Sequence, residues 1–405
     1  MTERRPSAPL AGLPLAGLPL ACVMGSTELV RPLGLAGVAS AVVTERHNPV
    51  SYSRFVRAVI EWPDAGAEPA ALVERLLRFA ATQPCPPVLF YEQDPQLLLV
   101  ARHRDRLARG FRFVLPDPAL VEALVDKGRF ASLAERLSLP VPPTRRIDPP
   151  RSDAGELGLR FPLILKPLTR GEDWAAIGGG AKALMVESPA ALRDLWPHLA
   201  AAKRGLLAQE MIPGPESAIE SYHVYVDATG AVVAEFTGRK IRTFPLALGH
   251  STALEITEAR DVVTIGRDVV ERLGLKGVAK LDFKRGPDGR LHLLEVNPRF
   301  NLWHHLGAVA GINLPALVHA DLAGLPRPPI AVRPRVGARW CWPTKDIHAA
   351  RAAGMPLASW LPWALGCDAK AVLAWDDPRP VLQSGLRRLL SRRPRPGDDG
   401  AGRRA

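Results

Sequence analysis

The sequence predicts a mixed α/β fold of two or three domains, and three observations support this. The chain has 405 residues, which is enough for two or three domains. Hydrophobic residues make up 47% and charged residues 23%, as expected for a chain with a buried core. From residue 21 to residue 117, short apolar strands alternate with helices, which is typical of a parallel sheet covered by helices.

The first region gives the clearest run of elements. We expect strands at 21–24, 39–43, 88–90 and 111–114, and helices at 29–36, 70–80 and 96–107. Asp94 is the expected N-cap of the third helix, with Pro95 in its first turn. Gly25-Ser26-Thr27 follows the first strand in place of a GxGxxG pattern, so a dinucleotide-binding Rossmann enzyme is disfavoured.

Beyond residue 117, strands and helices are mixed less regularly. We expect helices at 125–139, 190–201 and 262–273, and strands at 163–166, 183–186, 206–212 and 232–236. Lys166 ends an apolar strand, and it needs an anionic partner because burying an unpaired ammonium group is costly. Residues 178–182 form a glycine-rich loop that could wrap phosphates or make a simple turn. The GxxxxGK[ST] spacing is missing there, so the loop is not a Walker A motif.

The segment 280–299 carries the strongest functional signal and is predicted to be a β-hairpin. A Gly-Pro-Asp-Gly turn at 286–289 separates its two strands. Because side chains alternate along a strand, Glu295, Asn297 and Arg299 share one face of the return strand.

Whether Asp282 joins that face depends on the register of the hairpin. A turn centred between residues 287 and 288 pairs Asp282 with Leu293 and puts it on the face of Glu295, whereas a bulge at Gly289 would shift the register by one and reverse that. Clustered carboxylate and amide oxygens suit Mg²⁺ held together with substrate phosphates. The hairpin therefore indicates a metal-nucleotide site, with a solvated polar face as the alternative.

The hairpin motif, EVNPR with an aspartate thirteen positions before its glutamate, resembles the metal-binding end of the ATP-grasp superfamily. Three further segments match that family in order, namely LVDKGRF at 124–130, FPLILKP at 161–167 and QEMIPGPE at 209–216. Each motif is weak alone, but four in the right order are jointly specific. The resemblance covers roughly residues 22 to 325.

The resemblance implies a role for each matched residue. It implies phosphate contacts from Lys127, Lys166 and Lys240, main-chain contacts to adenine from Glu210 and Ile212, ribose binding by Glu216, metal binding by Asp282, Glu295 and Asn297, and catalytic charges on Arg299 and Lys240. The implied cofactors are ATP and two Mg²⁺ ions, with Mn²⁺ as an alternative metal.

The implied architecture is an ATP-grasp fold of two α+β lobes preceded by a Rossmann-like α/β domain. The expected boundaries are a flexible lead at 1–19, the first domain at 20–122, the ATP-grasp domain at 123–326, a C-terminal extension at 327–390 and a disordered basic tail at 391–405. The extension is rich in tryptophan, which we expect to form core rather than a binding surface.

The implied activity is that of a carboxylate–amine ligase similar to D-aspartate ligases. Such an enzyme activates a small-molecule carboxylate as an acyl phosphate, releases ADP and joins the acyl group to an amine. Two alternatives stay open: a kinase of the same fold that phosphorylates a small molecule, and a non-catalytic ATP-binding regulator.

Some polar residues have no firm role at this stage. Ser51, Ser53, Arg54 and Asp94 could face the substrate or serve as loop and cap residues. Of the adjacent His304 and His305, we expect one to pack or line the cleft and the other to be exposed.

The ends of the chain and its charge bear on location and partners. Pro9, Pro14 and Pro19 interrupt the apolar N-terminal segment, and no window is long enough to span a bilayer, so we expect a cytoplasmic protein. The net charge is +12, and arginines in 387–404 contribute much of it. That segment could bind nucleic acid or anionic membranes, but it has no aromatic residues for stacking, so we expect neither partner. The four cysteines are scattered without a CxxC pair, which disfavours zinc and disulfides and fits a reducing compartment.

Overall fold

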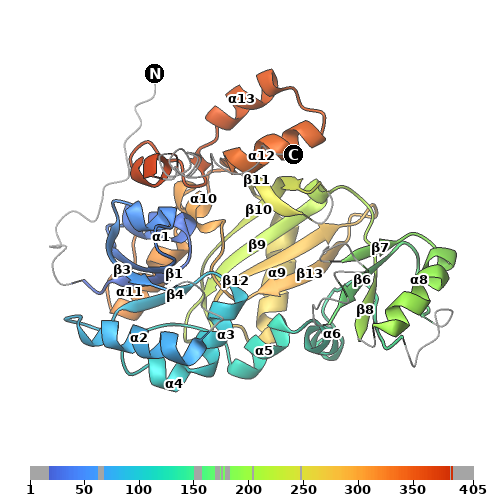
Figure 1. Cartoon of the computed structure of the whole chain (residues 1–405), viewed down its shortest axis with the longest axis horizontal. Helices are drawn as coiled ribbons and strands as arrows, with labels where there is room; N and C mark the ends of the chain where they lie inside the picture. Colours follow the sequence, from blue (N-terminus) through green and yellow to red (C-terminus); the bar gives the residue numbers. More distant parts are fainter. Residues whose placement is uncertain are drawn as a thin grey trace, which may run out of the picture.

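The computed structural model describes residues 18–62, 68–149, 157–168, 174, 177, 183–202, 205–246, 249–383 and 385. The strands of these residues form three sheets (Figure 1). The glycine-rich loop at 178–180 with Lys182, most of the N-terminal lead and the basic tail lie outside the described residues.

The first sheet is parallel, as the sequence predicts, and has the order β3-β2-β1-β4. Its strands are β1 (Ala21–Met24), β2 (Ser40–Thr44), β3 (Val56–Glu61) and β4 (Val88–Tyr91). Its connections contain α1 (Thr27–Leu35), η1 (Pro49–Tyr52), α2 (Pro69–Ala81), α3 (Asp94–Arg102) and α4 (Arg104–Leu107). The carboxyl ends of β1 and β4 lie side by side and face the rest of the molecule at residues 24–26 and 91–94.

Three local predictions for this region were wrong. The strand β3 was not predicted, because the charged residues Arg57 and Glu61 flank a short apolar run. The strand predicted at 111–114 is a single bridge between Arg112 and Val88, and the Val114 carbonyl accepts a hydrogen bond from the Tyr91 hydroxyl at 2.6 Å instead of one from the backbone of a neighbouring strand. Asp94 is the first residue of α3 and not its N-cap, which is Gln93.

A second, smaller sheet follows, with strand order β5-β8-β6-β7 and antiparallel pairing throughout. Its strands are β5 (Thr144–Ile147), β6 (Leu163–Pro167), β7 (Leu184–Val186) and β8 (Leu206–Glu210), and α8 (Pro189–Ala201) packs beside it. The helix predicted at 125–139 is α6 (Lys127–Arg136), and a further helix just before it, α5 (Pro118–Val125), was not predicted. Asp126 separates them and caps α6 by accepting a hydrogen bond from the Arg129 N–H at 2.7 Å.

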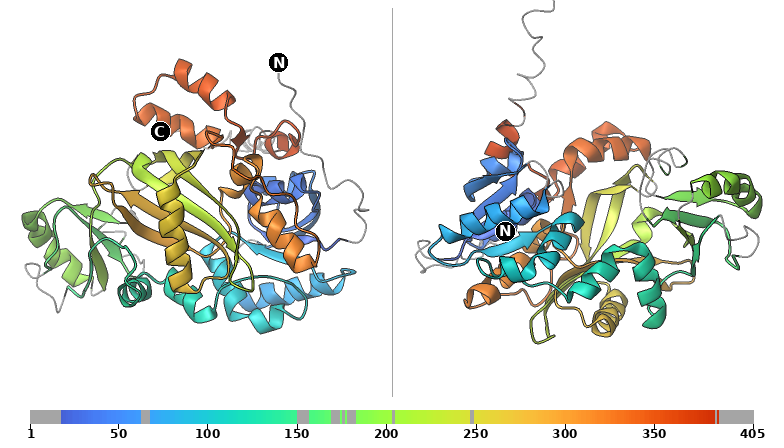
Figure 2. Two further views of the ribbon diagram at one scale, coloured as in Figure 1. Left: turned by 180° about the vertical axis from the view of Figure 1, so that it is seen from behind. Right: turned by 60° about the horizontal axis from the view of Figure 1, so that its bottom comes forward.

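The third sheet has seven strands in the order β13-β12-β9-β10-β11-β14-β15. They are β9 (Ile219–Val226), β10 (Val232–Phe244), β11 (His250–Thr257), β12 (Gly277–Arg285), β13 (Leu291–Asn297), β14 (Arg339–Cys341) and β15 (Ala369–Lys370). The helix α9 (Arg260–Leu273) lies across one face, as the view from behind shows (Figure 2). The other face packs on α10 (His304–Val309), α11 (Leu314–Ala323) and the first sheet in one continuous core.

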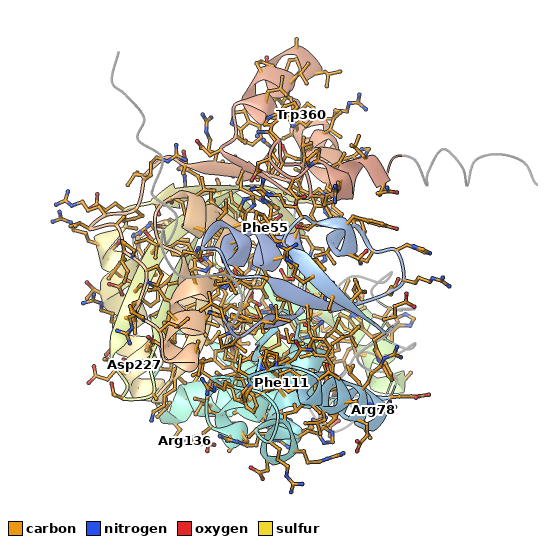
Figure 3. All side chains as sticks on the ribbon, turned by 90° about the vertical axis from the view of Figure 1, so that its left-hand side faces the viewer. Phe55, Arg78, Phe111, Arg136, Asp227 and Trp360 are labelled. Atoms are coloured by element: carbon orange, nitrogen blue, oxygen red, sulfur yellow. The ribbon has the colours of Figure 1, made fainter. Side chains whose placement is uncertain are left out.

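The C-terminal extension is attached to this large sheet. Its strand β14 pairs with β11, and the helices α12 (Pro343–Ala352) and α13 (Leu357–Leu365) follow. Trp340 and Trp360 are buried, as expected, and Figure 3 places Trp360 within the helical pair. Trp375 is 86% exposed, so the prediction that these tryptophans form core is wrong at this position.

Candidate active site

The carboxylates of Asp282 and Glu295 lie on one face of the β12–β13 hairpin, because the two residues are direct partners across the antiparallel pair. The next pair is Phe283 with Leu293, which leaves Leu294 as an extra residue on the return strand. The irregularity is therefore in the strand and not at Gly289, which serves the turn with a φ of +78°.

Asp282 is 2% exposed and is surrounded by hydrogen-bond donors and positive charge. The Ser221 hydroxyl donates to Oδ1 at 2.5 Å, and the Lys280 Nζ donates to Oδ2 at 2.7 Å. The Lys240 Nζ lies 3.7 Å from the same Oδ2. Burial alone would raise the pKa of Asp282, but the two lysine charges and these hydrogen bonds lower it below its ordinary value. Asp282 is therefore a permanent anion at the base of the site.

The remaining metal candidates form a chain of contacts along β13. The Asn297 amide donates to Glu295 Oε1 at 2.9 Å, and the Arg299 guanidinium donates to Asn297 Oδ1 at 3.3 Å. The Lys280 Nζ also lies 3.5 Å from Glu295 Oε1, so one ammonium group sits between the two carboxylates. Burial would lower the pKa of Lys280, but the charges of Asp282 and Glu295 raise it.

The oxygen donors fit a hard cation that substrate phosphates help to bind. The structure brings together two carboxylates and one amide oxygen, and a positive charge already lies between the carboxylates. Within the described part of the chain, no group of three or more His, Cys, Asp or Glu could hold a metal. This donor set matches Mg²⁺, which is commonly bound through one or two carboxylates plus phosphates.

Of the basic residues Arg239, Lys240 and Arg242 on β10, Lys240 is the one whose side chain reaches this site. Arg239 points to the opposite face of β10, because consecutive side chains alternate, and it pairs with Glu255 at 2.7 Å. Arg242, the next basic residue along β10, pairs with Asp346 at 2.7 Å. Lys240 thus remains the phosphate candidate among the three.

Arg299 joins the hairpin to the first sheet. Its guanidinium donates to the Asp94 carboxylate at the start of α3 and to the Glu92 carbonyl at 2.8 Å. The carboxylate of Glu92 in turn accepts hydrogen bonds from the Ser26 N–H at 2.6 Å and the Ser26 hydroxyl at 3.0 Å. Burial raises the pKa of Glu92. The ends of β1 and β4 therefore border the candidate site at its Arg299 end.

Two lysines lie toward the second sheet, Lys166 on the small lobe formed by that sheet with α8 and Lys127 on α6. The Lys166 Nζ donates to the Gln209 side chain at 2.8 Å, and the Lys127 Nζ donates to the Pro167 carbonyl at 3.2 Å. Burial lowers the pKa of Lys166, and the charge of Glu295 acts against this shift. Lys166 is thus within electrostatic reach of the hairpin on the facing lobe.

The predicted adenine and ribose residues lie at the end of β8 and just beyond it. The Glu210 carboxylate pairs with Arg160 at 2.9 Å, and its N–H donates to the Pro143 carbonyl at 2.9 Å. The Ile212 N–H has no hydrogen-bond partner among the described residues. Glu216 starts the short helix η2 (Glu216–Ala218).

Sequence reasoning missed two lysines on the site face. Lys280, Asp282 and Lys284 alternate on β12, and a period of two was the signal that could have found them. Burial lowers the pKa of Lys284, while the charge of Glu216 opposes that shift, which places Lys284 near the predicted ribose residue.

A cavity on this sheet is separate from these residues. Its volume is about 810 Å³, and its lining includes Pro213, Ser217, Arg239, Glu255 and Arg285. Its arginines already pair with glutamates, Arg239 with Glu255 at 2.7 Å and Arg285 with Glu220 at 2.6 Å. It lies on the face opposite Asp282, so we do not assign it to the candidate site.

The expectation that one of the paired histidines is exposed was wrong, because His304 and His305 are both buried. The His305 Nε2 accepts from Arg31 at 3.2 Å, and the ring lies near Glu28. His304 lies edge-on to His223, and neither ring has a hydrogen-bond partner among the described residues. Burial lowers the pKa of His304 to about 3.

Replacing His304 with Phe is expected to make stability less sensitive to acid. In the unfolded chain His304 has a pKa near 6.5 but in the folded protein about 3, so the unfolded state binds more protons between these values. Stability then falls as pH falls, by about 1.4 kcal/mol per pH unit for one such group. Between pH 6.5 and 5, His304→Phe should lose about 2 kcal/mol less than the unsubstituted protein.

Urea unfolding at these two pH values measures the difference. His198→Gln is the matched control, because His198 is exposed on α8. Equal pH dependence for His304→Phe and the unsubstituted protein would contradict the buried neutral state.

Residues 203–344 match the model of a family described as "ATP-grasp in the biosynthetic pathway with Ter operon". This match confirms the resemblance to the ATP-grasp superfamily over that part of the chain.

The chain is also similar to two amino-acid ligases and to one solved structure. The chain is 24% identical over 304 residues to the D-aspartate ligase of Enterococcus faecium, which covers 70% of each protein. It is 26% identical over 221 residues to the D-alanine–D-alanine ligase of Pseudomonas putida, covering 49% of this chain and 64% of the relative. An ADP complex of N5-carboxyaminoimidazole ribonucleotide synthetase superimposes with a TM-score of 0.58 at 16% identity, over 80% of this chain and 81% of that one.

No helix in the described ranges is both long and apolar enough to cross a bilayer.

Proposed function

We propose that this protein is an ATP- and Mg²⁺-dependent carboxylate–amine ligase that forms ADP. The proposal rests on one observation. On one face of β12 and β13, Asp282 and Glu295 lie opposite each other, and Lys240 and Lys280 lie close to Asp282. Relatives that are amino-acid ligases give the reaction class. The first sheet would complete the cleft, with domain boundaries near residues 122 and 326.

The nucleotide would lie between the small lobe and the large sheet. Its phosphates would meet Lys166 from the small lobe, Lys127 from α6 and Lys240 from β10. Adenine would pair with main-chain groups at Glu210 and Ile212. A nearby carboxylate, Glu216, would accept the ribose hydroxyls.

Asp282, Glu295 and Asn297 would hold Mg²⁺, and we propose two ions with Mn²⁺ as an alternative. When bound, Mg²⁺ neutralises phosphate charge and helps to orient the transferred phosphoryl group. Lys280 lies between the two carboxylates in this structure, so its ammonium group would have to shift toward the phosphates or the substrate when a metal binds.

The reaction would proceed in two displacements. A carboxylate oxygen of the acid attacks the γ-phosphorus, the bond to the β–γ bridging oxygen breaks, and ADP leaves. The amine nitrogen then attacks the carbonyl carbon of the acyl phosphate, phosphate leaves, and the nitrogen loses a proton. The protein contributes position and charge, with Lys166, Lys240 and Arg299 balancing the negative charge of the reacting groups.

A screen of ADP release tests this proposal. The purified protein is mixed with ATP and Mg²⁺, then with pairs of small carboxylates and amines, D- and L-amino acids included. We expect ADP and free phosphate in equal amounts, only when both co-substrates are present. A stable phosphorylated product from one substrate would instead indicate a kinase, and ATP binding without ADP from any pair would indicate a regulator.

A further inference from the structure

The strand that carries Lys240 is irregular immediately after this residue. Lys240 pairs with Leu254 and Arg242 with Ala253, so Ile241 is an extra residue on β10. The following pair is Thr243 with Ser251, which makes Thr252 an extra residue on β11. Bulges increase local twist and change the direction of neighbouring side chains. The direction of Lys240 therefore depends on how this double irregularity is held.

One carboxylate from the C-terminal extension accepts hydrogen bonds from both irregular segments, at Arg242 on β10 and at Thr252 on β11. Asp346 lies on α12, beside the ends of β10 and β11 (Figure 1), and is fully buried. Its Oδ1 accepts from Arg242 Nε at 2.9 Å and from the Thr252 hydroxyl at 2.8 Å. Its Oδ2 accepts from Arg242 Nη2 at 2.7 Å and from Trp360 Nε1 at 2.8 Å.

This arrangement gives the buried carboxylate four hydrogen bonds. The Arg242 guanidinium binds both carboxylate oxygens in parallel, which fixes its orientation as well as its distance. Its planar group also lies 3.9 Å from the centre of the Trp363 ring on α13. A buried pair of this kind is rigid, because breaking it leaves a charge without a partner.

We propose that Asp346 is a positioning residue that fixes Lys240 toward Asp282 by holding Arg242 and the double bulge. Lys240 is two residues from Arg242, and its Nζ lies 3.7 Å from Asp282 Oδ2. The expected effect of Asp346 on ATP binding rests on the proposed binding of ATP phosphates by Lys240. The extension thereby acquires a role in the active site through Asp346.

The variant Asp346→Asn tests the proposal through ATP affinity, measured by calorimetry. A displaced Lys240 should weaken ATP binding about 10-fold, since small misplacements from distant changes have effects of this size or larger. The decisive measurement is the double variant with Lys240→Ala. If Asp346 acts through Lys240, the double variant should bind ATP no more weakly than Lys240→Ala alone.

Glu235→Gln is the matched control. Glu235 lies on β10, the strand of Lys240, and it also binds an arginine, Arg267. Its side chain is on the face of β10 opposite to Lys240. Glu235→Gln should leave ATP affinity unchanged. If Asp346→Asn fails to fold, Trp360→Phe removes one hydrogen bond to Asp346 and keeps the ring. This milder variant should shift ATP affinity in the same direction.

A readout without nucleotide separates this inference from the proposed function. Amide hydrogen exchange of residues 240–244 should be faster in Asp346→Asn, and unchanged in Glu235→Gln. Unchanged exchange, unchanged ATP affinity, or additive effects in the double variant would each overturn the positioning role. An unsubstituted protein that binds no ATP would contradict the proposed function, and the exchange measurement would still decide whether Asp346 holds the strand.

Discussion

Glu295→Gln is expected to abolish ADP formation and to leave the fold intact. The Glu295 side chain is 54% exposed, so an amide of the same shape should cost little stability. It would nevertheless remove one of the two negative charges that face each other across the hairpin. Losing several kcal/mol of metal-assisted charge stabilisation corresponds to a rate reduction of about 100-fold or more.

A coupled assay of ADP release at saturating Mg²⁺ measures this effect, with thermal unfolding as the check on folding. Glu271→Gln is a suitable control, because Glu271 is exposed on α9 and faces away from the site. Near-full turnover of Glu295→Gln would remove this residue from the metal site.

Lys166→Ala should weaken ATP binding about 10-fold or more, because a charge-assisted contact in a closed cleft contributes roughly 1.5–3 kcal/mol. Burial already lowers the pKa of Lys166 in the absence of an anion. A bound phosphate would supply the charge that this ammonium group lacks, since its hydrogen bond goes to the neutral Gln209 side chain.

Calorimetric titration with ATP compares Lys166→Ala with Lys276→Ala, which removes an exposed lysine in the turn before β12. Lys203, a natural choice from the sequence, lies outside the described residues. Equal affinities of the two variants would show that Lys166 does not contact the nucleotide.

The hairpin could be predicted because its signals are local. A Gly-Pro-Asp-Gly turn and the alternation of Glu295 and Asn297 fix a strand pair over a few residues. The bulge at Leu294 could not be predicted, because it depends on which neighbours pack on the two sides of the return strand. The sequence therefore left two possible faces of the hairpin for Asp282, and the pairing of β12 with β13 decides between them.

The contact between Arg242 and Asp346 of the C-terminal extension could not be predicted for a different reason. Arg242 and Asp346 are 104 residues apart, and neither lies in a motif. A partner at that distance is chosen by the tertiary fold, since helical and strand periodicity carry information only about near neighbours. The same applies to Arg299, whose contacts with Glu92 and Asp94 bring the first sheet to the site.

The distribution of the hydrophobic cores determines how the cleft can open. The first sheet and the large sheet share one core, whereas the small lobe has its own. These two cores are separate, and the chain crosses between them through Pro140–Pro143 and again through Pro213–Pro215. If the proposed nucleotide enters by a hinge motion of the small lobe, the hinge would have a limited range of directions, because proline fixes φ at both crossings.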